Sequence, residues 1–463
     1  MISVFDPLHL GSVALDIMTC GRTSFESRQK SRLDILLSTA VRDSPFYRER
    51  MSGDSSIHPL LSDFPIVSRS ELMAQFDDWV TDPLLKLDQL RAFTSDPQKI
   101  GMPYLGKYLV WESSGTSNEP GIFVQDAQSL AVYDALEALR RNAPRPYQRW
   151  FDPLMLSERI AFVGAISGHF SSIVTMRRLR QVNPLMAQRL RCFSILQSPA
   201  ALVEELNAYA PTVIATYPTV AALLADEFSL GSLKFKPAEI WTGGETLTDT
   251  VRRYVEQTLG CDVRNNYGAS EFMLIGWECS HGKMHANADW LILEPIDERG
   301  NPVPPGQPSN STLLTNLANH VQPLIRYDLG DQVRVLSECC ACGSLLPIIE
   351  VQGRRDDSLV MRGCNGQAVT LLPLALTTVL EDDAAVFCFQ LLQHDESTLV
   401  LRLEARGQDG KLMAQRCQKA LDNFSVTQGL PLIRLIVKLG QTLSKGRSGK
   451  AKKIVALNKS EQH

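Results

Sequence analysis

The sequence lacks the features that direct a protein to a membrane or to nucleic acid. It has no apolar run long enough to span a bilayer, and its first stretch, MISVFDPLHLGSVALDIM, contains acids but no basic region of the kind that begins a secretory signal. The formal net charge of -4 over 463 residues gives no global positive field. We therefore expect a cytoplasmic protein that binds neither nucleic acid nor membrane.

Disulfide bonds and repeats are not expected either. The ten cysteines follow no secretory signal, so we interpret them as reduced thiols. No internal repeat or low-complexity segment stands out. What the chain does have is an ordinary globular composition, and at this length it can bury a large core and form about two to three domains.

The hydrophobic pattern changes along the chain. From about residue 27 to 100, apolar residues recur at helical spacing in SRQKSRLDILLSTAVRD and in SRSELMAQFDDWV, where Ser68 and Glu71 suit a capping box. From 108 to about 330, short apolar runs alternate with helical segments; these runs are YLVWE, RIAFVGAI, PTVIATYP, AEIWTGGE and DVRNNYGASE. The alternation predicts an α/β fold with mainly parallel sheets.

A smaller unit follows the stretch VQGRRDD. It contains apolar strands, STLVLRLE and LIRLIVKLG, around an expected helix at KLMAQRCQKALDNF. We therefore predict an N-terminal domain of residues 1–355 and a small α+β C-terminal domain of residues 356–463, with the boundary near Asp356.

Small polar residues follow several of the expected strands. In open α/β sheets ligands bind at the carboxyl ends of the strands, so these residues indicate one shared cleft. The stretch SSGTS after YLVWE offers N–H and O–H donors without bulky side chains, as a phosphate site requires. No Gly-Lys-Ser/Thr follows it, so it is not a Walker loop, and taken alone it is equally typical of a solvated hydroxyl-rich turn.

Six short motifs then occur in order along the chain: SSGTS, TGGET at 242, NNYGASE at 265, RYDLGD at 326, GRRDD at 353 and GRSGKAKK at 446. This ordered set, with SPFYRERM and FPIVSRSEL near the N-terminus, resembles the acyl-adenylate-forming ligases, and specifically their phenylacetate-CoA ligase-like branch. The resemblance covers essentially the whole chain. It implies a large ATP- and acyl-substrate-binding domain and a small mobile domain that swings about a hinge at Asp356.

The resemblance also implies a role for each motif. The phosphate loop would hold the β- and γ-phosphates of ATP with Ser113, Ser114, Gly115, Thr116 and Ser117. Tyr267 would lie against adenine, Glu271 would hold Mg²⁺ through a carboxylate oxygen, and Asp331 would bind the ribose hydroxyls. The other residues expected around the nucleotide are Gly243, Gly244, Glu245, Asn266, Gly268 and Ser270.

Two basic residues complete the catalytic set that the resemblance implies. Arg354 of GRRDD would join Asp331 at the ribose, and Lys450 would bridge the substrate carboxylate and the α-phosphate as charge develops. Without the other motifs, the run KGRSGKAKK is more typical of a solvated basic tail. One position departs from the family pattern, because Glu119 stands where such loops usually carry a lysine before the proline. A negative charge there weakens phosphate binding unless it points away.

Cysteine and histidine occur together in two separate stretches, ECSHGKMH and CCACGS. Cys279, His285, Cys340 and Cys342 form a chemically sensible tetrahedral set for a structural zinc ion, and some members of this branch carry zinc at matching positions. Cys339 and His281 are alternative ligands, and scattered buried thiols are the competing interpretation.

The acyl-substrate pocket is less determined. The resemblance places it near His169, Phe170, Tyr217 and the turn at Gly243 and Gly244, although a lone histidine among apolar residues is more often packed in a core. It implies an aromatic carboxylic acid, without a choice among phenylacetate-, benzoate- or anthranilate-type acids. The oligomeric state stays open, with a homodimer among the options.

The predicted reaction uses ATP and Mg²⁺ to convert the acid to an acyl-adenylate, which then forms a thioester with coenzyme A. A holo acyl carrier protein is the alternative acceptor, and the segments MRRLRQ at 176 and QRLRC at 188, expected as basic surface helices, suit either. The rival hypothesis is a catalytically weakened, zinc-containing relative that binds nucleotide or a partner protein. Lys450 argues against the rival, because a protein that only binds has no need of it.

Overall fold

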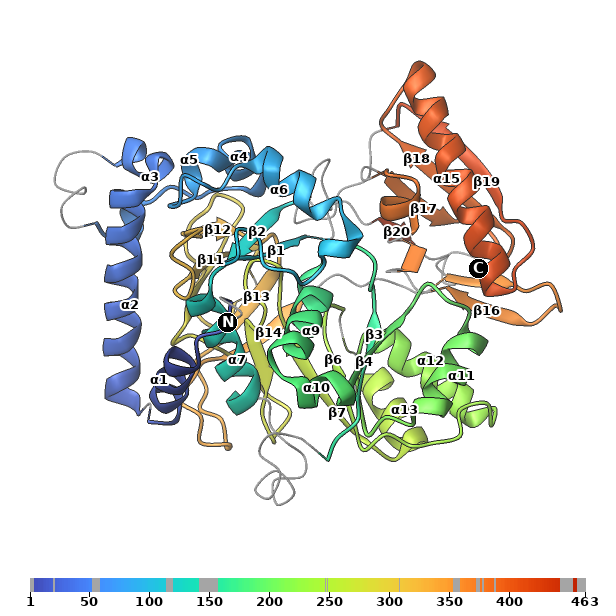
Figure 1. The fold of residues 1–463 in the computed structure, drawn as a ribbon, viewed down its shortest axis with the longest axis horizontal. Coiled ribbons are helices and arrows are strands. Elements are labelled where there is room, and N and C mark those ends of the chain that lie inside the picture. Colours follow the sequence, from blue (N-terminus) through green and yellow to red (C-terminus); the bar gives the residue numbers. More distant parts are fainter. Residues whose placement is uncertain are drawn as a thin grey trace.

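The computed structural model shows a large α/β body with a smaller unit at one corner, drawn in orange and red in Figure 1. It describes residues 4–19, 21–51, 59–113, 120–140, 157–245, 247, 249–307, 309–352, 359–371, 375–376, 379–386, 389–441 and 453–455. No helix in these ranges has the combination of length and apolar character that crossing a membrane requires.

The N-terminal region is helical, as its periodicity predicts. Ser68 caps α4, because its hydroxyl accepts a hydrogen bond from the Glu71 amide at 3.3 Å. The helices are α1 (Pro7–Met18), α2 (Arg22–Asp43), α3 (Pro45–Arg50), η2 (Leu61–Asp63), α4 (Arg69–Ala74), α5 (Phe76–Trp79), α6 (Leu87–Thr94) and η3 (Pro97–Lys99).

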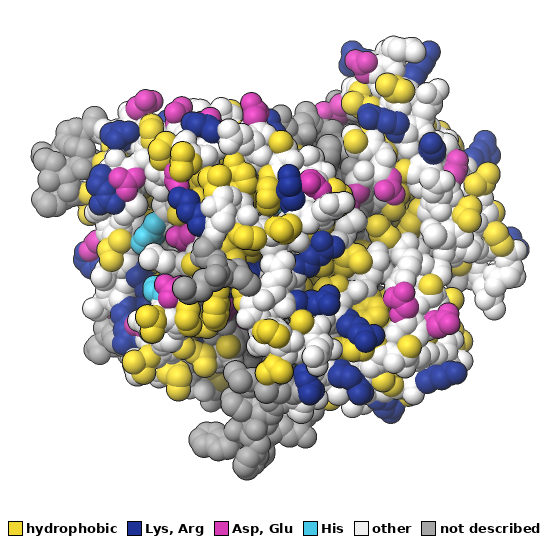
Figure 2. Space-filling view, in the orientation of Figure 1, with side chains coloured by type: hydrophobic (Ala, Val, Ile, Leu, Met, Phe, Trp, Pro, Cys, Tyr) yellow, Lys and Arg dark blue, Asp and Glu magenta, His cyan; other side chains and the backbone are white. Residues whose placement is uncertain are grey.

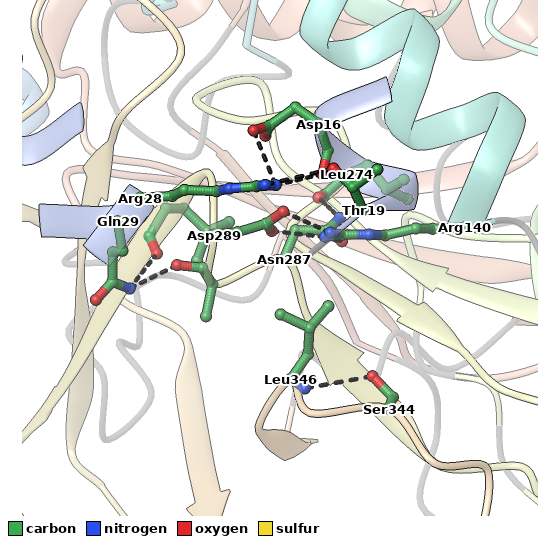
Figure 3. A network of polar contacts seen from close by, with 12 residues as sticks. Asp16, Thr19, Arg28, Gln29, Arg140, Leu274, Asn287, Asp289, Ser344 and Leu346 are labelled. Carbon is green, nitrogen blue, oxygen red and sulfur yellow. Dashed lines mark hydrogen bonds and ion pairs between the residues drawn. The ribbon is translucent and has the colours of Figure 1, made fainter. Parts of the chain in front are cut away.

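A buried polar network ties these helices to the body (Figure 3). Arg140 donates to Asn287 Oδ1 at 2.7 Å and to the Asp289 carboxylate, whose side chain is 1% exposed. Gln29 on α2 donates to the Ala288 carbonyl in the same loop. Because each buried charge has a hydrogen-bonded partner, the loop of residues 287–289 is held rigidly.

The centre of the body is a nine-stranded sheet of order β13-β14-β9-β8-β7-β6-β5-β3-β4 in the described part of the chain. Pairing is parallel from β4 to β7 and antiparallel from β7 to β13, so the expectation of mainly parallel sheets holds for one half of it. The strands are β3 (Ile160–Gly164), β4 (Leu190–Ser194), β5 (Val213–Thr216), β6 (Glu239–Thr242), β7 (Asp262–Tyr267), β8 (Gly276–Glu278), β9 (Met284–Ala286), β13 (Gln332–Leu336) and β14 (Ile348–Gln352).

Two expectations are corrected here. The run YLVWE forms β1 (Leu109–Glu112), which pairs antiparallel with β2 (Ile122–Gln125) in its own two-stranded sheet. The segment QRLRC is not one helix, because α10 ends at Arg189 and the edge strand β4 begins at Leu190. A short apolar run in the sequence indicates that a strand is buried, but it does not indicate which other strand pairs with it.

Both faces of the parallel half are covered by helices. Every residue of β3 is buried; Ala161 and Val163 pack in one core cluster and Phe162 in another, as the two-residue repeat of a strand requires. The helices are α7 (Ala127–Arg140), α9 (Ser171–Val182), α10 (Pro184–Arg189), α11 (Pro199–Tyr209), α12 (Pro218–Ser229) and α13 (Asp249–Leu259). A three-stranded sheet of β10 (Leu291–Ile296), β11 (Ser311–Asn316) and β12 (Tyr327–Asp328) completes the body.

The C-terminal unit is α+β. Its four-stranded sheet has the order β19-β18-β17-β20, and the expected strands and helix occur as β18, β19 and α15. The elements are β15 (Leu359–Arg362), β16 (Ala368–Leu371), η4 (Val379–Asp383), β17 (Phe389–Gln393), β18 (Thr398–Leu403), α15 (Gly407–Gln428), β19 (Arg434–Leu439) and β20 (Ile454–Val455).

One cluster of buried apolar residues includes side chains of both the body and the unit, and polar bonds between the two lie beside two strand ends. Ser167, after β3, donates to Asp382 Oδ2 at 3.1 Å, and Gln428 donates to the Gln197 carbonyl at 2.9 Å. The predicted boundary and hinge at Asp356 lie outside the described residues.

Candidate functional site

The residues of TGGET and NNYGASE meet at the carboxyl edge of the parallel half. Thr216, Thr242 and Asn265 lie side by side on β5, β6 and β7, and the Gly243 amide donates to the Thr216 carbonyl at 3.3 Å. The polar residues that follow these strands are therefore neighbours in space, as expected from the rule for α/β sheets.

Two of the predicted glycines are required by their surroundings. Gly244 has a φ of +79°, and a Cβ there would lie 3.2 Å from the ring of Tyr217. At Gly268 a Cβ would lie 2.0 Å from the Met273 carbonyl oxygen, which is closer than any side chain could approach. In both motifs, therefore, another part of the protein packs so closely against the backbone that only glycine fits.

The predicted adenine and ribose residues lie together. The Tyr267 hydroxyl donates to Asp331 Oδ2 at 2.8 Å, although the two residues are 64 positions apart. Tyr267 ends β7 and Asp331 directly precedes β13, so one bond joins a strand of the parallel half to the opposite end of the sheet order. An aromatic ring and a carboxylate in contact can serve the base and the sugar of one nucleoside.

Glu271, the predicted magnesium ligand, is bound by a tyrosine that the motif roles did not single out. The Tyr327 hydroxyl donates to Glu271 Oε1 at 2.6 Å, and the Glu271 side chain is buried. Burial and the neighbouring Glu271 carboxylate raise the pKa of Tyr327 well above its ordinary value, so the hydroxyl stays protonated and keeps donating. The sequence signal that could have identified Tyr327 is its position inside the RYDLGD motif.

Hydrogen bonds join the two described ends of the predicted phosphate loop. The Ser113 amide donates to the Gly121 carbonyl, and the Gly121 amide donates to Ser113 Oγ, both at 2.8 Å. The Trp111 indole donates to the Ser270 carbonyl at 2.8 Å, which joins the strand before the loop to NNYGASE. Arg69, which was not predicted, donates to Ser113 Oγ at 3.1 Å.

Several predicted residues lie outside the described residues. These are Ser114, Gly115, Thr116 and Ser117 of the loop, Glu119, Arg354, Asp356 and Lys450. Among the nearby lysines, Lys453 is described: its side chain is 7% exposed and its Nζ lies 5.2 Å from the centre of the Phe389 ring. Lys453 is therefore packed in the C-terminal unit, which makes it a poor substitute for a mobile catalytic lysine.

The three predicted pocket residues do not share one environment. Tyr217 lies against the Gly244 turn and is hydrogen-bonded to the backbone of Ala165, and burial raises its pKa well above the usual range. His169 is 1% exposed; its Nε2 lies 3.0 Å from the Asp96 carbonyl and its ring meets the edge of Phe93. These contacts are those of a packed histidine.

Phe170 has a backbone role that the prediction did not include. It directly precedes α9 and pairs with Glu112 of β1 in an isolated parallel bridge. The bridge holds the chain after β3 beside the strand that leads into the phosphate loop.

The four predicted metal ligands converge. One ligand atom from each of Cys279, His285, Cys340 and Cys342 lies within 4.8 Å of all the others. Cys279 Sγ is 3.6 Å from Cys340 Sγ, and Cys342 Sγ is 3.4 Å from His285 Nε2. These separations suit a tetrahedral zinc ion with Zn–S bonds of about 2.3 Å.

The surroundings of the cluster prepare it for a metal. His285 Nδ1 lies 2.8 Å from the Leu346 carbonyl, which it meets as a donor, so Nε2 carries the lone pair that faces the thiols. Burial raises the pKa of the Cys342 thiol to about 11, whereas hydrogen bonds from the Cys342 backbone and side chain lower the pKa of Cys340. Binding a divalent cation would favour the thiolate at both. The alternatives His281 and Cys339 are not part of this group.

The chain is similar in sequence to curated enzymes and in fold to solved structures. No family model matches the chain. The chain is 26% identical to the phenylacetate-coenzyme A ligase of Thermus thermophilus, over 76% of the chain and 75% of that protein. It is 25% identical to the enzyme of the same name from Pseudomonas putida, over 78% and 76%.

Among solved structures, a 2-hydroxyisobutyryl-CoA ligase in complex with 2-HIB-AMP and CoA matches with a TM-score of 0.55 at 18% identity, covering 95% of this chain and 90% of that one. This likeness concerns the fold alone. Fold and relatives together define an adenylate-forming ligase, that is, an ATP-dependent acid–thiol ligase. In sequence the chain resembles the phenylacetate-CoA ligases of that superfamily.

Proposed function

We propose that this protein activates an aromatic carboxylic acid with ATP and transfers the acyl group to coenzyme A. The observation that carries the proposal is the pairing of motif residues that are distant in the sequence: Tyr267 with Asp331, and Glu271 with Tyr327. These pairs supply a nucleoside site and a carboxylate for Mg²⁺ within one short segment of NNYGASE.

In the first step a carboxylate oxygen of the acid bonds to the α-phosphorus of ATP, and pyrophosphate leaves. Glu271 would hold Mg²⁺ on the phosphates, and Lys450 would neutralise the charge that develops between carboxylate and α-phosphate. In the second step a thiolate attacks the acyl carbon and AMP leaves. Carboxylate is a poor electrophile, and bonding one of its oxygens to the phosphorus of AMP turns that oxygen into part of a good leaving group, which makes the second step feasible.

The aromatic substrate is supported by the names of the curated relatives, which are phenylacetate-coenzyme A ligases, and by the ring of Tyr217 beside the Gly244 turn. The proposal gives His169 no role toward the acid: its Nε2 lies at the Asp96 carbonyl, and its Nδ1 is buried without a hydrogen-bond partner among the described residues.

Coenzyme A is placed before a carrier protein as the acceptor because the curated relatives are named as coenzyme A ligases. Figure 2 shows Lys and Arg side chains over the region of α9 and α10, where α9 carries Arg177 and Arg180 and α10 ends at Arg189. Positive charge of this kind attracts the phosphates of coenzyme A and equally an acidic carrier protein. Parallel assays with both acceptors, after the acyl-adenylate has formed, decide between them.

The Cys/His cluster is proposed to hold one structural zinc ion. Its four protein ligands leave no open position for catalysis, and the cluster joins the β8–β9 turn to the loop between β13 and β14. Zinc would therefore stabilise the antiparallel half of the sheet beside the nucleotide site.

Acid-dependent exchange of pyrophosphate into ATP, with a panel of aryl acids, tests the proposal. We expect exchange with at least one aryl acid. Replacement of Lys450 by Ala should lower the exchange rate by a factor of about 100 or more while ATP still binds, because this charge acts mainly in the transition state. Lys453→Ala is the comparison variant. It should lower the stability of the fold, and the folded variant should keep the pyrophosphate-exchange rate of the wild type. A wild-type protein that binds ATP but exchanges with no acid would instead support the binding-only relative that Glu119 motivates.

A further inference from the structure

We propose that Tyr327 and Asn316 are positioning residues for Glu271: together they fix the backbone and the carboxylate of this predicted Mg²⁺ ligand before ATP binds. The inference rests on the proposed function and deepens it, because it assigns the residues that aim the Glu271 side chain. The motif roles gave chemistry to neither residue, and Asn316 lies outside all six motifs.

The turn that carries Glu271 is anchored on both sides of this residue. The Ala269 amide donates to the Phe272 carbonyl at 3.0 Å, which closes the turn, and the Phe272 side chain is fully buried in the core. The Trp111 indole donates to the Ser270 carbonyl at 2.8 Å. The backbone at Glu271 is therefore held by its neighbours in the chain and by a distant strand.

Asn316 holds the carbonyl of Glu271 itself. Its Nδ2 donates to that carbonyl at 3.1 Å, its Oδ1 accepts the Ala318 amide at 2.9 Å, and the side chain is 0% exposed. Because both ends of the buried amide are bonded, its orientation is fixed. Asn316 ends β11, and Leu314 of the same strand pairs with Tyr327 of β12. One small sheet therefore carries both residues that bond to Glu271.

Tyr327 holds the side chain of Glu271. Its hydroxyl donates to Glu271 Oε1 at 2.6 Å. Tyr327 is 3% exposed and is held by a parallel bridge to Val67, whose amide donates to the Arg326 carbonyl and whose carbonyl accepts the Asp328 amide. A glutamate side chain has several rotatable bonds, so this contact means that its freedom is lost when the protein folds and not when a metal binds.

The donor to Glu271 is neutral, and this suits a metal ligand. In the described part of the chain the Glu271 carboxylate accepts the Tyr327 hydroxyl and forms no ion pair. A hydroxyl orients a carboxylate without compensating its charge, whereas a lysine or arginine would compensate it. Mg²⁺ binds at nucleotide phosphates through one or two protein carboxylates, so a single charged and oriented glutamate fits it.

Calorimetric binding of ATP to Tyr327→Phe, with excess Mg²⁺ and again with a chelator, tests the proposal without any acid substrate. The change removes the orienting hydroxyl and keeps the Glu271 charge. We therefore expect wild-type affinity in the chelator and roughly 10-fold weaker binding with Mg²⁺, the size of a lost partner of a metal ligand. Tyr47→Phe is the matched control, because the Tyr47 hydroxyl is also buried but donates to the Pro323 carbonyl.

A double variant shows whether Tyr327 acts through Glu271. In Glu271→Gln the carboxylate is absent, so adding Tyr327→Phe should weaken ATP binding with Mg²⁺ no further. Wild-type affinity of Tyr327→Phe with Mg²⁺, an equal loss with and without Mg²⁺, or a full additional loss in the double variant would overturn the proposal. A wild type whose ATP affinity does not depend on Mg²⁺ would overturn it as well.

Asn316→Ser keeps the proposal testable if Tyr327→Phe fails to fold. It removes the amide that bonds the Glu271 carbonyl, so we expect ATP binding to weaken a few fold with Mg²⁺ and to stay unchanged in the chelator. Asn319→Ser is its control, because Asn319 is buried in the same way and donates to the Val124 carbonyl. Equal behaviour of the two asparagine variants would contradict the role of Asn316.

The magnesium dependence of pyrophosphate exchange separates positioning from a general loss of structure. With an acid that the wild type activates, Tyr327→Phe should need roughly 10-fold more Mg²⁺ for half-maximal exchange and recover most of the wild-type rate at saturation. A rate that stays low at every Mg²⁺ concentration would overturn the positioning role. Absence of exchange in the wild type contradicts the proposed function, whereas the calorimetric results decide the role of Tyr327 by themselves.

Discussion

The two halves of the nine-stranded sheet position functional residues in different ways. In the parallel half, β5, β6 and β7 end at the same edge, and Tyr217, Gly243 and Tyr267 lie at or directly after those ends. In the antiparallel half, the candidate metal ligands lie on β9 and in the connections that follow β8 and β13. β7 belongs to both halves, since it pairs parallel with β6 and antiparallel with β8.

Parallel and antiparallel pairing suit different kinds of site. Parallel strands gather many short loops at one edge and leave a cleft for a ligand. Antiparallel strands join through tight turns whose ends are already close, which suits a closed four-ligand cluster that clips two turns together. We therefore expect residues of the parallel edge to affect activity and residues of the metal cluster to affect stability first.

The largest expected effect is on activity, at Glu271 beside the parallel edge. Glu271→Gln removes the charge that would hold Mg²⁺, and we expect acid-dependent pyrophosphate exchange to fall by about 100- to 1,000-fold with little change in melting temperature. Glu350→Gln is the control, because Glu350 pairs with Arg334 on the antiparallel half, where its side chain is half exposed. A large loss of stability in Glu271→Gln, with activity falling only in proportion, would contradict the expectation that residues of the parallel edge act mainly on activity.

The next effect is on stability, at the metal cluster. Cys342→Ser should leave the purified protein with less than one zinc per chain, and if zinc saturates the wild type 100-fold above its dissociation constant, losing it costs about 2.7 kcal/mol of unfolding free energy. Elemental analysis and chemical denaturation measure the two quantities. Cys339→Ser is the control, because it changes an exposed neighbouring thiol outside the cluster; its zinc content and unfolding free energy should equal those of the wild type. A zinc-free Cys342→Ser of full stability and activity would contradict a structural clip.

A smaller effect separates backbone strain from loss of space at the parallel edge. Gly244→Ala imposes a strained φ and also places a Cβ against Tyr217, whereas Gly231→Ala imposes a similar φ of +78° in open space. Both should lose about 1–2 kcal/mol of stability. Gly244→Ala should in addition raise the KM for the acid. Equal kinetics in the two variants would show that Tyr217 and the turn do not form the acyl pocket.

The smallest effect is expected at the bond that joins Tyr267 to Asp331. Tyr267→Phe keeps the ring for the base and removes one hydroxyl, so the KM for ATP should rise by only a few fold, corresponding to about 0.5–1.5 kcal/mol. Tyr254→Phe, which removes a surface hydroxyl bonded to Asp226, is the control and should leave the KM unchanged. A much larger rise would mean that the hydroxyl itself orients Asp331 for ribose binding.

The types and the order of the candidate functional residues can be read from the sequence without a structure. The sequence supplied Gly268 as a nucleotide-site candidate and Cys279 and His285 as candidate zinc ligands, because these expectations depend on residue type and motif; the clash of a Cβ at Gly268 and the convergence of the ligands come from the structure. The pattern of apolar runs also predicted the α/β body, since burial on both faces leaves a continuous hydrophobic signature.

Which of those residues meet depends on the packing of distant segments in the folded chain. Pairing direction is not written in a single strand, so the antiparallel half of the sheet and the separate β1–β2 hairpin were missed. The contacts of Tyr327 with Glu271 and of Arg69 with Ser113 join residues far apart in the chain, and His169 turns toward Asp96. Periodicity reports how deeply a side chain is buried, whereas its partner is set by packing between segments that are distant in sequence.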